Sequence, residues 1–131
     1  MVREPATKIQ PSSSAAPQSS SARPVDFEHL ARYTLGEEAL EREVLELFCK
    51  QSVLYLEQLR AATSDTDWKL AAHSLKGSAR AIGAWSVAQA AERAEAPHGD
   101  GLAQFRSARI DEIAASLREA EAYIVAELAS R

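Results

Sequence analysis

The sequence of 131 residues contains a single cysteine, and this scarcity excludes two kinds of site. With Cys49 alone, no disulfide bond can form within the chain and no cluster of metal-binding thiolates can be built. We expect Cys49 to be a small core side chain. Histidines are also few, and neither His29 nor His98, which we expect at the surface, has a set of His, Asp or Glu at metal-ligand spacing around it. No metal site is predicted.

Glycine and proline are scarce, with five of each, and three of the prolines lie in the first 17 residues. The rest of the chain therefore has few helix breakers. Residues 1–22 are rich in Ser, Ala, Pro and Gln, and they lack the apolar periodicity needed to offset the entropy lost on ordering. We expect a disordered tail over residues 1–22 and one folded domain over residues 23–131.

Long hydrophobic runs are missing as well. No stretch approaches the roughly 20 apolar residues that cross a bilayer, and no apolar run of about 7 to 15 residues follows the first basic residue, as it would in a signal peptide. We therefore expect no membrane association and a cytoplasmic protein.

The chain has no excess of basic residues. It carries 15 Lys and Arg against 19 Asp and Glu, and the part after residue 23 carries 12 against 18. A domain with this acidic balance should not bind nucleic acid through bulk charge. Against that background, the local group formed by Lys69, Lys76 and Arg80 suits an acidic docking partner, although a solvated helix face explains Lys69 and Arg80 about equally well.

What the sequence does have is helical periodicity from Val25 onward, with no alternating strand pattern. The expected helices cover about 25–33, about 37–62, a segment ending near Gly83, about 86–96 and about 102–129. Thr34 and Glu37 resemble a capping box that starts the second of these. Short connections make successive helices antiparallel. The predicted fold is therefore all-α, an antiparallel four-helix bundle with a short extra N-terminal helix.

Apolar rows at helical spacing predict which residues face the core. In the helix before residue 63 the row is Leu40, Val44, Leu47, Phe48, Leu54, Tyr55 and Ala62. In the helix ending near Gly83 it is Trp68, Ala71, Ala72, Leu75, Ala79 and Ile82. In the last two helices it is Ala84, Val87, Ala91 and Ala94, and then Phe105, Ile113, Leu117, Ile124 and Leu128.

The segment from Ala72 to Ser78 brings together the imidazole of His73, the ammonium group of Lys76 and a glycine, Gly77, which has no side chain. On a helix, Lys76 and Gly77 return to the side of His73, three and four residues on. The apolar row lies opposite, so His73 should face solvent. Glycine inside a helix costs about 1 kcal/mol relative to alanine. A close approach by another molecule would explain why Gly77 is present despite this cost. Such a group suits phosphate chemistry.

The segment AHSLKGSARAIGAWSVAQAAERAE, from Ala72 to Glu95, resembles the histidine-containing phosphotransfer (HPt) domains of multistep phosphorelays. The positions that carry the resemblance are His73, Leu75, Lys76, Gly77, Ser78, Gly83 and Glu95. Upstream, Val25-Asp26-Phe27 and Leu35-Gly36-Glu37 look like the family's opening helix and the start of its second. One departure is Ala94, where the family commonly has leucine.

The resemblance implies that His73 accepts a phosphoryl group from a receiver-domain aspartate of a hybrid histidine kinase and passes it to the receiver domain of a response regulator. A neutral imidazole, with an ordinary pKa near 6.5, can attack phosphorus directly. Lys76 would stabilise charge on the phosphoryl oxygens. Gly77 would leave room for the partner's aspartyl phosphate and its magnesium, and Ser78 is small and could donate a hydrogen bond.

Glu95 is the candidate acceptor for one nitrogen of His73, which would leave the other nitrogen as the nucleophile. An ordinary carboxylate at the edge of the core is the alternative for Glu95. Because no glycine-rich nucleotide loop is visible, we expect no kinase activity and no cofactor of the chain's own. The resemblance also implies a monomer.

Two other functions are open. The same helix face could bind receiver or kinase domains as a docking module that carries no phosphate. A hydrolytic enzyme using His73 with Ser74 or Ser78 is less favoured, because neither serine lies on a strained elbow and no oxyanion site is visible.

Overall fold

The computed structural model describes residues 23–97 and 101–131. This part contains the helices α2 (Phe27–Thr34), α3 (Glu38–Ala61), α4 (Asp65–Ile82), α5 (Trp85–Glu95) and α6 (Leu102–Ala129), and no strand. The all-α prediction is confirmed, and each helix ends within a few residues of its expected position. The tail predicted over 1–22 and His98 lie outside the described residues.

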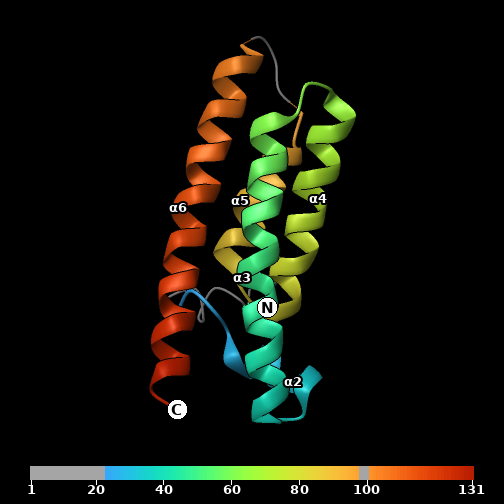
Figure 1. Ribbon diagram of the computed structural model, residues 1–131. Coiled ribbons are helices and arrows are strands. Elements are labelled where there is room, and N and C mark those ends of the chain that lie inside the picture. The colour runs from blue at the N-terminus through green and yellow to red at the C-terminus, as the bar shows by residue number, and fades with distance from the viewer. Residues whose placement is uncertain (1–22, 98–100) are drawn as a thin grey trace, which may run out of the picture.

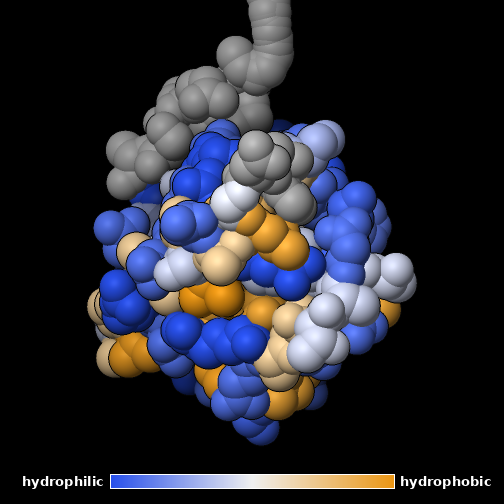
Figure 2. Space-filling model, turned by 90° about the horizontal axis from the view of Figure 1, so that it is seen from above, coloured by the Kyte–Doolittle hydropathy of each residue, from blue (hydrophilic) through white to orange (hydrophobic). Residues whose placement is uncertain are grey.

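The four longer helices form an antiparallel bundle (Figure 1). Helix α3 packs against α4 and α6, and α5 packs against the same two helices. The short helix α2 lies at one end, against α3 and α4. At the opposite end, around the α3–α4 turn, hydrophobic and hydrophilic residues are interspersed in the space-filling view (Figure 2). Across the described residues, no helix combines the length and the apolar character that a membrane span requires.

The core rows predicted for α4 and α5 are confirmed, since all of their members are buried. In α6, Phe105 is half-buried and the rest of the row is buried. Trp68 is the anchor between α4 and α5, because its indole N–H donates a hydrogen bond of 2.8 Å to the carbonyl of Ala94. That carbonyl lies in the last turn of α5, where helix carbonyls have no partner in their own helix. The bond therefore fixes the end of α5 against α4.

The core row predicted for α3 is only partly right: Phe48 is buried, and Val44, Tyr55 and Ala62 are half-buried against the core, but the three leucines of the row are exposed. The side chains that α3 buries are Glu41, Leu45, Phe48, Ser52 and Leu59. The predicted members Leu40, Leu47 and Leu54 are instead 36%, 51% and 55% exposed. The interior face of α3 includes the carboxylate of Glu41 and the hydroxyl of Ser52. A prediction that counts only apolar residues therefore misplaces the buried face of this helix.

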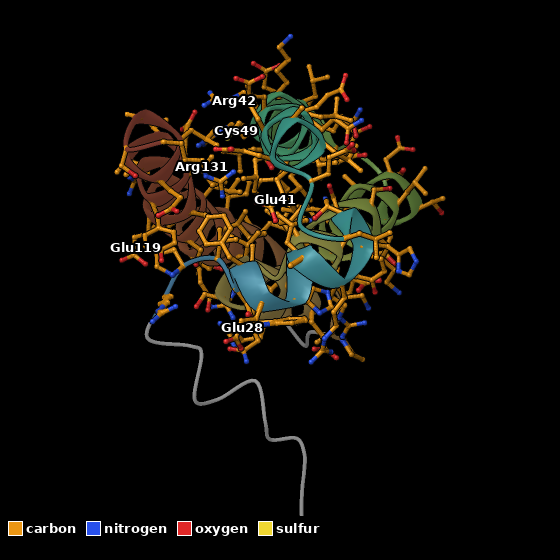
Figure 3. All side chains as sticks on the ribbon, turned by 90° about the horizontal axis from the view of Figure 1, so that it is seen from below. Glu28, Glu41, Arg42, Cys49, Glu119 and Arg131 are labelled. Carbon is orange, nitrogen blue, oxygen red and sulfur yellow. The ribbon has the colours of Figure 1, made fainter. Side chains whose placement is uncertain are left out.

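The buried carboxylate of Glu41 has partners at the lower end of the bundle (Figure 3). Its Oε1 lies 2.9 Å from a guanidinium nitrogen of Arg131, and its Oε2 lies 3.3 Å from Oγ1 of Thr34. A buried charge is tolerated when it is paired and hydrogen-bonded. These contacts tie the start of α3 to the end of α2 and to the residues after α6.

The predicted capping box is also wrong, for a related reason. Thr34 is the last residue of α2, and its hydroxyl faces the interior toward Glu41. Helix α3 begins at Glu38, and its N-cap residue Glu37 makes no side-chain cap hydrogen bond. Between the two helices the chain turns through left-handed conformations at Leu35 (φ 54°) and Gly36 (φ 76°), which separates Thr34 from the start of α3.

Helix α2 is fixed to the α4–α5 junction through Gly83. The N–H of Asp26 donates to the carbonyl of Gly83 at 2.9 Å. Gly83 has φ 80°, and a Cβ there would lie 2.7 Å from the carbonyl oxygen of Asp26, so the close approach requires glycine. His29, expected at the surface, is half-buried, with its ring edge-on to those of Trp85 and Tyr33.

Candidate functional site

His73 lies on the outer side of α4, with its side chain 69% exposed. Its neighbours Ala72 and Leu75 are fully buried, so the opposite face of α4 packs against the core. Nδ1 of His73 lies 3.1 Å from Oε2 of Glu95 on α5. The two residues are 22 positions apart in the sequence and come together because α4 and α5 are antiparallel.

The other oxygen of Glu95 lies 2.6 Å from Nζ of Lys76. These two side chains are only 17% and 21% exposed, much less than His73. One carboxylate therefore contacts both the ring and the ammonium group, which places His73, Lys76 and Glu95 in a single cluster.

Electrostatics keeps Glu95 ionised at neutral pH. Burial raises the pKa of Glu95, but the hydrogen bond and positive charge of Lys76, and then those of His73, outweigh burial and hold this pKa below its ordinary value of 4.5. An ionised carboxylate can only accept hydrogen bonds. Nδ1 of His73 must therefore carry the proton in this contact, and in a neutral ring the lone pair is on Nε2.

Gly77 has no steric role inside the protein. A Cβ added there would meet no heavy atom within 4 Å beyond the backbone of its own helix. Since glycine weakens a helix by about 1 kcal/mol relative to alanine, nothing in the described fold accounts for its presence. The open space lies on the outside of α4, one turn after His73.

The other predicted site residues lie around this cluster without joining it. Ser78 is half-buried within α4, and its hydroxyl takes part in none of the side-chain hydrogen bonds found among the described residues. Five residues after His73, it points about 140° away around the helix. Lys69 pairs with Asp65 at 3.4 Å, and Arg80 pairs with Glu92 at 3.7 Å.

These two ion pairs are exposed, with side chains between 52% and 60% accessible. Exposed pairs of this kind contribute about 0 to 1 kcal/mol, so both cations can exchange their partner for another anion.

The structure adds apolar residues that sequence reasoning missed. Leu40, Leu47 and Leu54 are seven residues apart along α3, so they form one exposed row, which we call the α3 leucine stripe. Leu70, three residues before His73 on α4, is 63% exposed. The seven-residue spacing of Leu40, Leu47 and Leu54 indicated that they share one face of α3. The sequence did not show that this face is exposed, because it gave no sign that Glu41 is buried.

The α3 leucine stripe comes close to the level of His73. Gln58 of α3 and Leu70 of α4 line the same small hollow. Antiparallel helices advance by equal steps from their connecting turn. Leu54, one turn before Gln58, is therefore level with Ser74, one turn after Leu70. Leu54 is thus close in level to His73, and the exposed Leu70 is three residues before His73 on α4.

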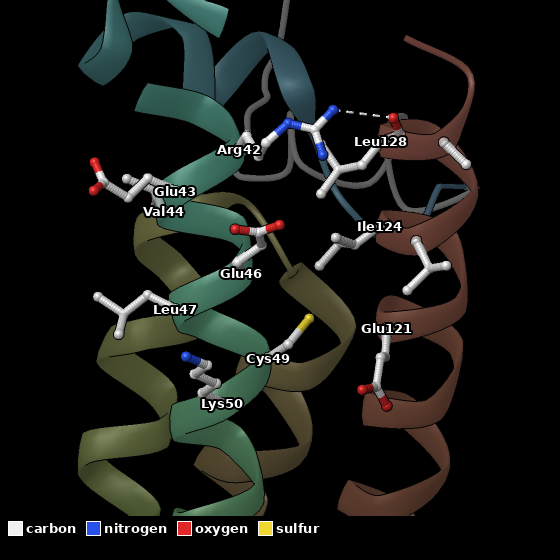
Figure 4. Close-up of a pocket in the computed structure, with 12 residues that line it drawn as sticks. Arg42, Glu43, Val44, Glu46, Leu47, Cys49, Lys50, Glu121, Ile124 and Leu128 are labelled. Atoms are coloured by element: carbon white, nitrogen blue, oxygen red, sulfur yellow. Dashed lines mark hydrogen bonds between the residues drawn. The ribbon is translucent and has the colours of Figure 1, made fainter. Parts of the chain in front are cut away.

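A groove of about 1030 Å³ lies elsewhere, between α3 and α6 (Figure 4). Its walls include Val44, Ile124 and Leu128, and Arg42 closes one end by donating to the carbonyl of Leu128 at 3.2 Å. Cys49, expected in the core, is half-buried in this groove. Burial raises the pKa of Cys49, and nearby Glu121 and Glu46 raise it further, so its thiol stays protonated at neutral pH.

Among the described residues there is no group of three or more His, Cys, Asp and Glu that could hold a metal ion.

The family model for the Hpt domain matches residues 43–123, which contain every residue of the His73 cluster. The match covers more than half of the chain, and the chain belongs to this family of histidine phosphotransfer domains, which act in phosphorelays and interact with receiver domains. The chain is also similar to the crystal structure of the histidine phosphotransferase ShpA from Caulobacter crescentus, with a TM-score of 0.62 and 28% sequence identity over 82% of this chain and 92% of that one. A search of curated proteins gave no match.

Proposed function

We propose that His73 accepts a phosphoryl group from the aspartate of a hybrid histidine kinase receiver domain and passes it, reversibly, to the receiver aspartate of a response regulator. The observation that best supports this proposal is the contact of 3.1 Å between Nδ1 of the exposed His73 ring and Glu95. This contact leaves Nε2 as the nucleophile. Phosphoryl transfer depends chiefly on alignment and charge stabilisation. Glu95 supplies the alignment, and Lys76 supplies the positive charge.

The surroundings of His73 fit a receiver domain as the partner. Gly77 leaves room for the partner's aspartyl phosphate and its bound magnesium. The α3 leucine stripe and Leu70 offer an apolar contact surface, while Lys69 and Arg80 offer positive charge at its edge. In this proposal magnesium belongs to the receiver, and the chain is a cytoplasmic monomer with neither a cofactor nor kinase activity of its own. Its folded domain covers residues 23–131.

The test is to incubate the protein with a phosphorylated receiver domain and to measure protein-bound label that is labile to acid and stable to alkali. We expect labelling of the wild type and of His98→Ala, and none of His73→Ala. Equal labelling of wild type and His73→Ala would contradict the proposal. Receiver binding without any label on His73 would favour the docking module.

A further inference from the structure

We propose that a cavity between α3 and α6, beside Ser52, binds a small, uncharged, mostly apolar molecule that carries one hydrogen-bonding oxygen, such as a phenol or an alcohol. The cavity has a volume of about 280 Å³. It continues the groove of Figure 4, because Cys49 and Glu121 line both. No residue of the His73 cluster lines it, so this site is independent of the phosphotransfer proposed above.

The hydroxyl of Ser52 is the first reason to expect a bound molecule. Ser52 lies in the middle of α3 and is 4% exposed, and its Oγ has no hydrogen-bond partner within the described residues. A serine inside a helix often bonds to the carbonyl four residues back, which here is that of Phe48, but Ser52 makes no such bond. Buried polar groups without a partner are rare and costly. Rotation about the single bond χ1 can turn this hydroxyl toward the cavity that Ser52 lines.

Small side chains on facing helices create the space. Cys49 and Ser52 of α3 lie opposite Ala114 of α6, and all three line the cavity. Protein interiors are otherwise close-packed, so larger apolar side chains at these positions would fill the gap. The cavity is therefore a product of these particular residues and can be closed by a single substitution.

The remaining walls are mostly apolar. Phe48 and Leu117 are buried, Leu56 is half-buried, and Val53 is exposed at the edge. Ligand pockets commonly measure about 300 to 1,000 Å³, and an apolar cavity of about 150 Å³ is enough to bind benzene. The volume beside Ser52 therefore suits one aromatic ring or a short alkyl chain.

The charges around the cavity favour an uncharged molecule. Burial raises the pKa of Cys49, and Glu121 and Glu46 raise it further, so the thiol is neutral at pH 7. The charged side chains of the wall are exposed, and two are acidic and two basic: Glu57, Arg60, Arg118 and Glu121. A charged group placed inside would lose its hydration without a buried opposite charge to offset the cost. A hydroxyl or carbonyl oxygen can instead bond to Ser52.

The experiment titrates the protein with p-cresol and with toluene, which differ by one hydroxyl group, and follows the backbone amide signals by NMR. We expect both compounds to shift the signals of residues that line the cavity. In Ser52→Ala, the affinity for p-cresol relative to toluene should fall about fivefold, the effect of one neutral hydrogen bond. The matched control is Ser107→Ala, which removes an exposed hydroxyl from α6 and should leave this ratio unchanged.

Ala114→Leu tests the space itself. The larger side chain should fill the cavity from the α6 side and abolish the binding of both compounds. Thermal unfolding gives a second measurement, because a molecule that binds the native state raises the melting temperature. We expect p-cresol to raise it in the wild type and not in Ala114→Leu.

Three results would overturn the proposal. The first is an absence of shifts in the wild type at millimolar p-cresol. The second is an equal affinity ratio in wild type and Ser52→Ala, which would mean that water is the partner of the hydroxyl. The third is equal binding by wild type and Ala114→Leu, which would mean non-specific association. Ala114→Leu leaves Ser52 in place, so the proposal is still tested if Ser52→Ala does not fold.

Discussion

The ammonium group of Lys76 and the carboxylate of Glu95 lie 2.6 Å apart, although they belong to different helices. The same carboxylate contacts the ring of His73. The carboxylate that contacts His73 therefore also joins α4 to α5, so its removal should be visible in stability as well as in the proposed phosphotransfer.

Glu95→Gln should lower the free energy of unfolding by about 1 kcal/mol at pH 7, because the pair is only partly exposed. The pKa of Glu95 is lowered in the folded protein, so this stabilisation is fully present above the unfolded pKa and is lost as the pH falls through the folded one. Urea unfolding of both proteins from about pH 7 to pH 3 should show the difference shrinking at the acidic end. A difference that stays constant with pH would contradict this assignment.

Gly77→Ala should stabilise the protein by up to about 1 kcal/mol, because alanine favours helix and the added methyl group meets no neighbour. The same methyl group should slow transfer from a receiver, since it occupies the space proposed for the partner. Urea unfolding and the rate of labelling measure the two effects. The control is Ala122→Gly, an exposed position on α6, which should destabilise the protein to a similar extent without changing transfer. Unchanged transfer in Gly77→Ala would remove the proposed role of Gly77.

Leu54→Asp should weaken receiver binding about tenfold or more, because it places a charge within the proposed apolar contact. Leu54 is already 55% exposed, so the unfolding free energy should change by less than about 0.5 kcal/mol. The matched control is Val125→Asp on α6, at a position 60% exposed and away from His73. Binding is measured by titration with a receiver, and labelling by phosphoramidate should be equal in both variants. Equal binding by the two would argue against a docking role for the stripe.

The α3 leucine stripe also marks what the sequence could not predict. The faces of α4 and α5 could be predicted because their apolar rows contain no polar member. In α3 the interior face carries Glu41 and Ser52, and the partner of Glu41 is Arg131, 90 residues away in the chain. No local pattern encodes such a contact, so the apolar count added the exposed Leu40, Leu47 and Leu54 to the buried Phe48 and missed the two polar members of the face.

The cluster at His73 was predictable in part. Lys76 and Gly77 share a helical face with His73, and helix periodicity is enough to place them there. Glu95 lies on another helix, and its angle on α5 showed only that it could reach a neighbour. That its two oxygens are divided between Nδ1 of His73 and Nζ of Lys76 depends on how α5 packs against α4.

That packing depends on Trp68, which gives the last prediction. Trp68→Phe keeps an aromatic ring but removes the 2.8 Å hydrogen bond to Ala94, the residue before Glu95. We expect a loss of about 1 to 2 kcal/mol in unfolding free energy, because a buried carbonyl loses its partner, and slower labelling of His73, because the end of α5 is no longer fixed.

Trp85→Phe is the control, since it removes the 3.2 Å hydrogen bond from Trp85 to Asp26 at the other end of α5. It should also lower stability, but it should leave the labelling of His73 by a phosphorylated receiver unchanged. Thermal unfolding and initial labelling rates, measured well below both melting temperatures, separate the two effects. If the two variants slow labelling equally, the effect reflects general destabilisation; if only Trp68→Phe slows it, the position of Glu95 against α4 is what sustains transfer.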